Sequence, residues 1–356
     1  MRFEDFSQSE REDFFASLES STDIPVSLIE KDIWLCLVMR NVFGNPQKLP
    51  MVFKGGTSLS KIYGAIDRFS EDVDVSIDCV RLVERYTGRK FNPATAGRAM
   101  MDKVLDSLEQ CVPKYISDVI LPELNREVER LGCKVLFETD EKGRGENVFV
   151  SYPAATEVSG YIKPVLRIEF GGRNIFSDDF SKYEVRSYAS RVDIPVDIAF
   201  PSARDVVVLP IERTFHEKAT ILHVFCNRYE NGRLKKTERA SRHWYDFAKL
   251  HEFPACMSAM SDVRLLADVV GHKTKFFRDN MGGYEKCLRG EMKLVPEGHL
   301  LNELKKDYDA MRSGNMFFGT SKRPPEFEYI MEVVSRAETE MNEYILAALS
   351  THDGNR

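Results

Sequence analysis

The spacing of apolar and polar residues divides the chain into a mixed first part and a helical second part. Between residues 12 and 43 the apolar positions recur at helical spacing, which predicts two helices. The break between them falls at Asp23-Ile24-Pro25. Pro25 favours an early position in the second helix, because its missing N–H costs nothing there. Residues 95–131 show the same spacing, and from Ile211 onward the pattern is helical almost to the end.

Shorter segments with alternating apolar residues predict the strands of the first part. They are residues 48–56, 71–78, Cys133–Phe137, Val148–Tyr152 and Tyr161–Phe170, with edge strands expected within Arg186–Pro201. A helix predicted at Ser58–Ile66 separates the first two strands. The polar loop Thr139–Asn147 is expected to join the third and fourth strands into a hairpin.

The length of the chain, 356 residues, is sufficient for a large core and predicts two closely packed lobes. The boundary is expected near Pro201–Pro210. Residues 1–205 then form a catalytic lobe of helices and strands, and residues 206–356 form a C-terminal helical lobe that completes the active site.

Composition limits the class of protein. The chain is 43% hydrophobic and 30% charged, as is ordinary for a soluble enzyme. No apolar run reaches the ~18 residues of a membrane span, and the N-terminal segment lacks the apolar core of a signal peptide. The seven cysteines are scattered without a CxxC pair, which predicts reduced thiols in a cytoplasmic protein. A net charge of −6 argues against a generally basic coat for nucleic acid, although it leaves room for a local basic face.

The most informative segment is Phe53–Asp78, which has the sequence FKGGTSLSKIYGAIDRFSEDVDVSID. Asp72 and Asp74 lie two positions apart on a predicted strand, so they point to the same face. Adjacent carboxylates repel each other unless a cation lies between them, and Mg²⁺ prefers such oxygen ligands together with substrate phosphates. The Gly-Gly turn lets backbone N–H groups approach a phosphate. The segment therefore predicts a site for a metal–nucleoside triphosphate, and a solvated Asp pair is the alternative.

The order Gly-Gly, helix, Ser-x-Asp-x-Asp resembles the first motif of the polymerase-β-like nucleotidyltransferases. The sequence pattern KGGTSL…Y…RFSEDVDV is similar to that of the AbiEii/AbiGii-type toxin branch of that superfamily. The resemblance implies an α+β fold, with a nucleotidyltransferase-like mixed sheet, flanking helices and the C-terminal helical lobe. It also implies Mg²⁺ or Mn²⁺ as cofactor and an NTP as substrate. The nucleotide-binding residues that it implies in this segment are Gly55, Gly56, Thr57, Ser58 and Ser70.

A helix before this segment carries Glu30-Lys31-Asp32-Ile33-Trp34, and a similar EKDxW element often precedes the Gly-Gly turn in the resembled family. A plain amphipathic core helix is the alternative explanation. The strand YIKPVLRIEFGGRN places Lys163, Arg167 and Glu169 on one face. Beside the Asp pair, Glu169 is a candidate third metal ligand, and Arg167 or Lys163 is a candidate phosphate contact. A half-exposed antiparallel strand has the same alternation.

Two later helices supply the remaining candidates. In IERTFHEKATILHVF, Lys218 lies among apolar neighbours, and the resemblance implies that it contacts the nucleotide phosphates. The alternative is a lysine whose stem lies on apolar surface. In ASRHWYDFAKL, Arg242 and Asp246 are neighbours on one helix face and match the family's fourth motif. Asp246 then either orients Lys218 or approaches the base or ribose, and a surface ion pair is the alternative.

Two basic segments bear on the acceptor. The loop Asn227–Arg242 is dense in Arg and Lys, so it either steers an RNA backbone or is a mobile surface loop. Lys273–Arg278 interleaves bases with aromatics, which suits stacking on unpaired nucleotides or a buried Phe pair flanked by lysines. The sequence shows no zinc spacing, no P-loop and no G-x-S-x-G motif, and a hydrolase triad is unsupported.

These observations predict a metal-dependent nucleotidyltransferase that moves NMP from an NTP to an acceptor hydroxyl. The resemblance implies a toxin of a bacterial toxin–antitoxin or phage-defence (abortive infection) system, an antitoxin encoded nearby, and RNA as acceptor, with the tRNA 3′ end as a known target type. Two alternatives remain open. One is a nucleotide-binding regulator without transfer activity, and the other is transfer to a protein hydroxyl.

Overall fold

The computed structural model divides into two compact units. It describes residues 1–19, 21–139, 146–157, 163–174, 176–177, 179–192, 197–234, 237–279, 281–314, 316–317 and 324–353. The first unit, called here the sheet unit, comprises Met1–Ile62 and Phe69–Leu209. The second, the helical unit, comprises Tyr63–Arg68 and Pro210–Arg356. The short segment Tyr63–Arg68 is therefore a part of the helical unit that comes from the first half of the sequence.

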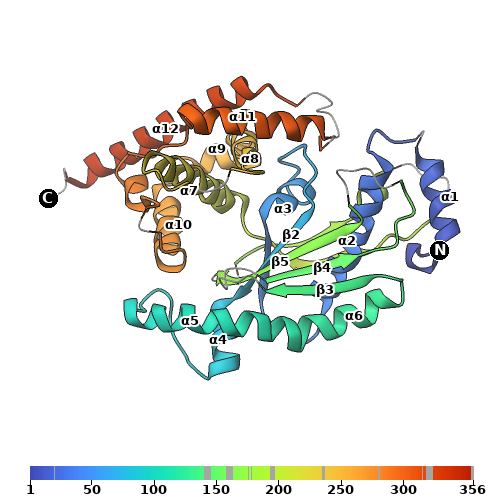
Figure 1. The fold of residues 1–356 in the computed structure, drawn as a ribbon. Helices are drawn as coiled ribbons and strands as arrows, with labels where there is room; N and C mark the ends of the chain where they lie inside the picture. Colours follow the sequence, from blue (N-terminus) through green and yellow to red (C-terminus); the bar gives the residue numbers. More distant parts are fainter. Residues whose placement is uncertain are drawn as a thin grey trace. The chain divides into compact units, whose positions relative to one another are not determined.

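The centre of the sheet unit is a five-stranded mixed sheet with the order β1-β2-β5-β4-β3 (Figure 1). Its strands are β1 (Met51–Lys54), β2 (Asp72–Asp78), β3 (Lys134–Thr139), β4 (Glu146–Ser151) and β5 (Val165–Asn174). β2 and β5 are parallel, whereas β1/β2, β4/β5 and β3/β4 are antiparallel pairs. The predicted α+β class, mixed sheet and β3–β4 hairpin are confirmed; residues 140–145 of the hairpin loop lie outside the described residues.

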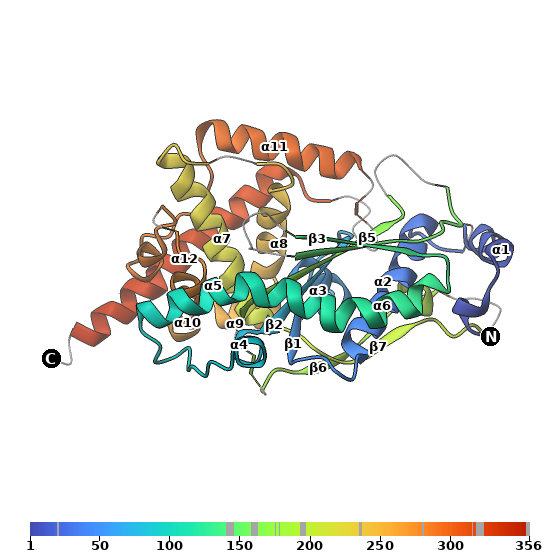
Figure 2. The ribbon, with the colours of Figure 1, turned by 60° about the horizontal axis from the view of Figure 1, so that its bottom comes forward.

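Helices precede and separate the first strands of the sheet unit along the chain. The helices of the sheet unit are α1 (Gln8–Leu18), α2 (Val26–Gly44), α3 (Gly55–Lys61), α4 (Cys79–Thr87), α5 (Arg98–Tyr115) and α6 (Leu121–Glu129), with the short turn η1 (Phe3–Asp5) before them. A π-helical segment, η2 (Ile116–Ile120), joins α5 and α6 into one long element, which runs along the sheet in Figure 2. The break between α1 and α2 is where the sequence predicts it.

The close approach of α4 and α5 to the sheet is visible at Gly172 of β5. A Cβ atom at this position would lie 2.7 Å from Val112 and 3.1 Å from both Leu108 and Leu82, so only glycine fits. The side chains of β5 alternate accordingly. Leu166, Ile168 and Phe170 are fully buried on the covered face, and the residues between them are partly exposed on the opposite face. The opposite face carries the candidate acidic residues.

The structure corrects two predictions about the connections of the sheet unit. Helix α3 begins at Gly55 and ends at Lys61, so the predicted helix Ser58–Ile66 is displaced toward the N-terminus. It ends early because Gly64 has a φ of +60°, which an α-helix does not contain. The expected edge strands within Arg186–Pro201 are also wrong for the described residues.

Strands lie on either side of that segment instead. They are β6 (Lys182–Arg186) and β7 (Ser202–Val207), which pair antiparallel in a second sheet. Between them, η3 (Tyr188–Arg191) is a 3₁₀-helix. It forms because the Ser187 hydroxyl accepts from the N–H of Ala189, and the N–H of Tyr188 donates to the Asp32 carboxylate over 2.6 Å. Residues 193–196 of this segment lie outside the described residues.

The helical unit confirms the helical pattern predicted from Ile211 onward. Its elements are α7 (Ile211–Glu230), α8 (Ser241–His251), α9 (Pro254–Ala259), α10 (Val263–Phe276), η4 (Tyr284–Leu288), α11 (Gly298–Ser313) and α12 (Phe327–Asp353). Helices α7 and α8 pack together through stacked rings of Phe215 and Phe247, whose centroids are 5.1 Å apart. Of the helices that the structure describes, none is long and apolar enough to cross a membrane.

Candidate active site

Gly55 brings the start of helix α3 directly against the carboxylate of Asp74. Gly55 has a φ of +80°, which side chains rarely adopt, and it links β1 to α3. A Cβ atom at this position would lie only 1.9 Å from Oδ2 of Asp74. Any residue larger than glycine would therefore displace this carboxylate. The turn and the acidic strand that the sequence predicts to act together are in contact.

Asp72 and Asp74 lie on one face of β2, beside Arg167 and Glu169 of β5. The parallel register pairs Asp72 with Arg167 and Asp74 with Glu169. Arg167 donates to both oxygens of Asp72, with Nε–Oδ1 at 3.0 Å and Nη2–Oδ2 at 2.8 Å. Burial lowers the pKa of Arg167, but the charge and hydrogen bonds of Asp72, with smaller effects of Glu169 and Asp74, raise it overall. Arg167 therefore serves as the cation among these carboxylates.

A row of polar residues extends from this pair across the sheet. Lys54 of β1 lies opposite Asp74, and Asn147 of β4 lies opposite Glu169. Because directly opposed residues on neighbouring strands point to the same face, the row runs Lys54–Asp74–Glu169–Asn147. Lys54 lies in a predicted strand, whereas Asn147 was expected at the end of the loop Thr139–Asn147 and lies instead in β4.

The hydroxyls near the Gly-Gly turn hold α3 to β2. The Thr57 hydroxyl donates to the carbonyl oxygens of Ser70 and Asp72, and the Ser58 hydroxyl donates to that of Gly55 over 2.8 Å. Thr57, Ser58 and Ser70 are all buried, as is Gly56. These hydroxyls therefore contribute to the packing of α3 on β2. The backbone N–H groups at the start of α3 are the donors that an α-helix leaves without an intrahelical partner.

Lys163 stands apart from the row of Arg167 and Glu169. Strand β5 begins at Val165, so Lys163 lies before it; residues 161 and 162 lie outside the described residues. The Lys163 side chain is exposed, and its carbonyl oxygen accepts from Nζ of Lys31 over 3.1 Å. In the described strand, the face that carries Arg167 therefore begins at Val165.

The EKDxW element forms ion pairs with the residue before the acidic strand and with helix α3. Nζ of Lys31 contacts Glu71 at 2.7 Å, and Glu71 directly precedes Asp72. Asp32 forms a buried ion pair with Lys61, the last residue of α3. Burial alone lowers the pKa of Lys61, but the Asp32 charge raises it overall. Both residues are almost fully buried, and breaking such a pair costs about 3–5 kcal/mol. The element is thus more than an amphipathic core helix.

In the helical unit, Asp246 joins two cations. Its Oδ1 accepts from Nε of Arg68 at 2.7 Å, and its Oδ2 accepts from Nη2 of Arg68 at 2.8 Å and from Nζ of Lys218 at 2.7 Å. Asp246 is completely buried. Burial would raise the pKa of Asp246, but the charges and hydrogen bonds of Arg68 and Lys218 hold it well below its usual range. Both oxygens of Asp246 are therefore engaged by cations, and neither is exposed to solvent.

Arg68 is a residue that the sequence analysis missed. Its partner Asp246 lies 178 positions away, and no local spacing links the two. The residues around it dock on α8 as well. The N–H of Asp67 donates to the Tyr245 hydroxyl over 3.2 Å, and the Asp67 carboxylate pairs with Lys249 at 3.2 Å. The matched Arg242 is partly exposed, and its charge contributes to lowering the pKa of Lys218 after the larger effect of burial.

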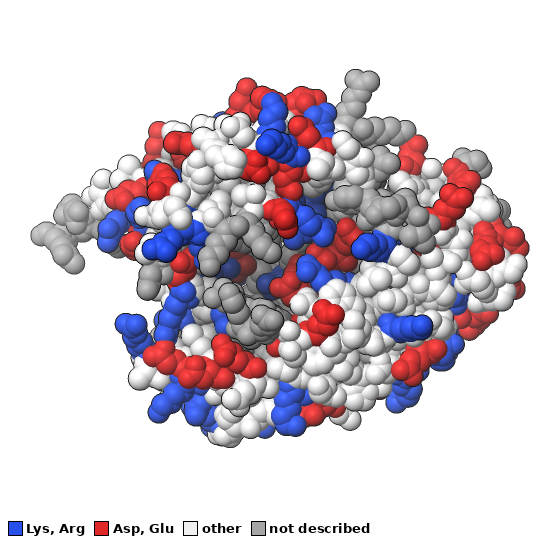
Figure 3. All heavy atoms as spheres, viewed as in Figure 1, with Lys and Arg blue, Asp and Glu red and all other residues white. Residues whose placement is uncertain are grey.

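The basic segments have mixed surroundings. The predicted loop Asn227–Arg242 is too long, because α7 continues to Glu230 and α8 begins at Ser241. Residues 235 and 236 of this segment lie outside the described residues, and Asp307 fixes its end by accepting from the N–H groups of Arg239 and Ser241. In Lys273–Arg278, Phe276 is fully buried and Phe277 is exposed. On the face in Figure 3, acidic and basic side chains are interspersed over the described residues.

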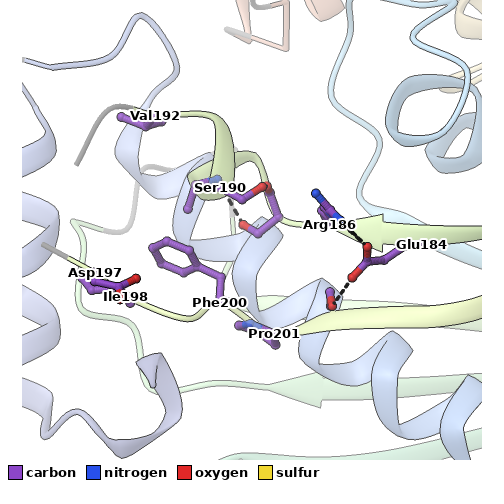
Figure 4. Close-up of a pocket in the computed structure, with 11 residues that line it drawn as sticks. Glu184, Arg186, Ser190, Val192, Asp197, Ile198, Phe200 and Pro201 are labelled. Atoms are coloured by element: carbon purple, nitrogen blue, oxygen red, sulfur yellow. Dashed lines mark hydrogen bonds and ion pairs between the residues drawn. The ribbon is translucent and has the colours of Figure 1, made fainter. Parts of the chain in front are cut away.

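One cavity beside a polar cluster does not involve the candidate residues. It measures about 420 Å³, and its lining includes Glu184, Arg186, Ser190, Asp197, Phe200 and Ser202 (Figure 4). Glu184 already accepts from Arg186 over 2.7 Å and from the Ser202 hydroxyl over 2.8 Å. Because these groups satisfy one another, the cavity offers no argument for chemistry.

The carboxylates on this face suit a divalent cation that is bound partly by the protein and partly by the substrate. Among the described residues, no group of three His, Cys, Asp or Glu side chains converges on one point, so Asp72, Asp74 and Glu169 form no preassembled three-ligand site. Mg²⁺ is usually held by one or two carboxylates together with substrate phosphates. Asp72 and Asp74 on one face meet that requirement, and the guanidinium of Arg167 already stands in as a cation at Asp72.

The sequence matches the family model described as "Nucleotidyl transferase AbiEii toxin, Type IV TA system" over residues 39–333. The solved structure of MenT4, a nucleotidyltransferase toxin from Mycobacterium tuberculosis H37Rv, aligns with 96% of this chain and 99% of its own, at 14% identity and a TM-score of 0.41. No curated protein matches the sequence.

The family match covers the Gly55 turn, the acidic pair on β2 and the Lys218–Asp246 cluster. It extends over most of the sheet unit and of the helical unit. The chain therefore belongs to the AbiEii nucleotidyl transferase toxin family, whose members act in type IV toxin–antitoxin systems.

Proposed function

We propose that this nucleotidyltransferase uses a divalent metal ion to move NMP from an NTP to a hydroxyl of RNA, with the 3′ end of tRNA as the first candidate acceptor. The observation that carries the proposal is the contact between the Gly55 turn and the Asp74 carboxylate, beside Asp72 on the same face of β2. This arrangement combines backbone N–H groups for a phosphate with two carboxylates for a cation.

Asp72 and Asp74 are the residues proposed to hold Mg²⁺ or Mn²⁺. When bound, such an ion neutralises the triphosphate charge while pyrophosphate leaves. Arg167 keeps the carboxylates from repelling each other, and Lys31 fixes the strand through Glu71. Glu169, whose side chain is 45% exposed, is the candidate for accepting the proton of the acceptor hydroxyl.

Lys218 is proposed to bind the phosphates of the NTP. Among the described residues, Arg68 and Lys218 both contact the carboxylate of Asp246. Arg242 adds to the positive charge that Lys218 experiences. Lys218 is suited to a phosphate as a compact cation. Asp246 then acts through Lys218 as a positioning residue.

RNA is proposed as acceptor because the family motif and the basic segment Asn227–Arg242 both fit a nucleic-acid substrate. The family also implies an antitoxin as partner. All seven cysteines are free and buried, in agreement with the proposed cytoplasmic location.

The acceptor is identified by incubating the purified protein with each α-³²P-labelled NTP, Mg²⁺ and either total RNA or cell extract. We expect label in an RNA band that disappears after RNase treatment. Label that disappears after protease treatment instead would identify a protein acceptor. Binding of NTP by calorimetry, with no pyrophosphate released in the presence of either mixture, would support a nucleotide-binding regulator.

A further inference from the structure

The ammonium group of Lys218 contacts two acceptors on the same helix. Its Nζ lies 2.7 Å from Oδ2 of Asp246 and 3.3 Å from Nδ1 of His243. The Lys218 side chain is 8% exposed, so its head group is nearly enclosed. An ammonium has three N–H donors. Asp246 and His243 take two of them, and among the described residues the third has no acceptor.

The contact fixes the tautomer of His243. Burial, followed by the charges of Lys218 and Arg242, lowers the pKa of His243 well below its usual value. The imidazole is therefore neutral, with one nitrogen that donates and one that accepts. Because an ammonium can only donate, Nδ1 of His243 is the acceptor and the proton lies on Nε2.

His243 and Asp246 are three positions apart on α8 and so lie on the same side of the helix. The helix is held firmly around them. Nε1 of Trp244 donates to the carbonyl of Leu294 over 2.9 Å, and Phe247 stacks on Phe215 of α7. Two acceptors on a rigid helix determine the direction of the remaining N–H bond of Lys218.

We propose that His243 is a positioning residue that aims the third N–H of Lys218 at a phosphate of the NTP. Without it, the ammonium is free to rotate about its bond to Asp246, and the third donor loses its direction. The inference rests on the proposed role of Lys218. It adds a residue that the family motif does not require, since the motif matches Arg242 and Asp246 only.

The test compares two substitutions of His243. His243→Phe keeps the ring volume and removes the acceptor, whereas His243→Asn keeps an acceptor oxygen near the position of Nδ1. We expect His243→Phe to lower kcat roughly 10-fold, the effect of one hydrogen bond to a charged group, with little change in KM for the NTP. His243→Asn should retain most of kcat. His251→Phe, on the same helix but paired with Glu340, is the control that should keep kcat unchanged.

A second measurement does not depend on activity. In protein labelled with ¹⁵N-histidine, NMR should show His243 with a proton on Nε2 and none on Nδ1, and the Nδ1 resonance should move in Lys218→Met. A proton on Nδ1, or His243→Phe with wild-type kcat, would overturn the positioning role. If wild-type protein transfers no nucleotide, the proposed function fails, and the tautomer still tests the contact itself.

Discussion

Replacement of the buried carboxylate in the helical unit should destabilise that unit strongly. Asp246→Asn preserves the size and shape of the side chain and removes the charge that contacts Arg68 and Lys218 at 2.7–2.8 Å. Asp246 is fully buried, and the side chains of Arg68 and Lys218 are 4% and 8% exposed. Loss of one partner from such a buried pair costs about 3–5 kcal/mol. This is a large part of the ~5–15 kcal/mol by which proteins are typically stable.

The assay uses the two tryptophans of the chain, Trp34 in the sheet unit and Trp244 on α8. In a Trp34→Phe background, fluorescence from Trp244 reports urea unfolding of the helical unit. Asp268→Asn is the matched control. Asp268 pairs with Arg213 but is 68% exposed, so the same substitution should cost less than about 1 kcal/mol.

A further variant separates charge from packing. Asp246→Leu combined with Arg68→Met and Lys218→Met removes all three charges, and it should regain most of the stability lost in Asp246→Asn, because an apolar replacement leaves no unpaired ion. If Asp246→Asn loses no more than Asp268→Asn, or if the triple variant is as unstable as Asp246→Asn, the desolvated cluster is not what stabilises the unit.

The same cluster predicts a pH dependence. The folded pKa of Asp246 is lowered, so its contribution to the free energy of unfolding is fully present above the unfolded pKa of about 3.9. It is lost as the pH falls below that value. The stability difference between wild-type protein and Asp246→Asn should therefore be constant near neutral pH and shrink below about pH 4. A difference that grows on acidification would contradict this assignment.

Two further predictions concern the acidic face of the sheet. Gly55→Ala should abolish most transfer activity, because the new Cβ displaces Asp74, whereas Gly88→Ala, with a similar φ of +69° and open space, should lose only about 1–2 kcal/mol of stability and keep its activity. Equal activity losses in the two variants would refute the contact. Arg167→Gln should bind Mn²⁺ more tightly in a titration followed by EPR, because a competing cation leaves Asp72; unchanged or weaker binding would contradict this competition.

Local patterns predicted the parts of the fold that depend on neighbouring residues. The alternation of side chains along a strand correctly predicted that Asp72 and Asp74 share one face, and the polar loop correctly predicted the β3–β4 hairpin. Helix α4 was missed, although Asp78 caps it by accepting from the N–H groups of Val80 and Arg81. Its nine residues follow β2 with no loop between them, so the apolar positions of strand and helix merge in the sequence.

Contacts between distant segments account for what the sequence did not predict. Arg68 looks like an ordinary loop residue until Asp246 is placed against it, and the assignment of Tyr63–Arg68 to the helical unit follows from such contacts. The hydroxyls of Thr57 and Ser58 match a phosphate-binding pattern, but their hydrogen bonds to backbone carbonyls depend on how α3 packs on β2. Spacing identifies which residues are present and cannot identify their partners.

The most direct test of the central claim follows the fate of the α- and γ-phosphates of the NTP. Purified protein is incubated with the acceptor RNA, Mg²⁺ and NTP labelled at either position, and compared with Asp72→Asn and Asp74→Asn. The account predicts that the α-label enters the RNA while the γ-label leaves as pyrophosphate, and that both variants lose the transfer. Transfer of the γ-label, or undiminished transfer of the α-label by either variant, would contradict it.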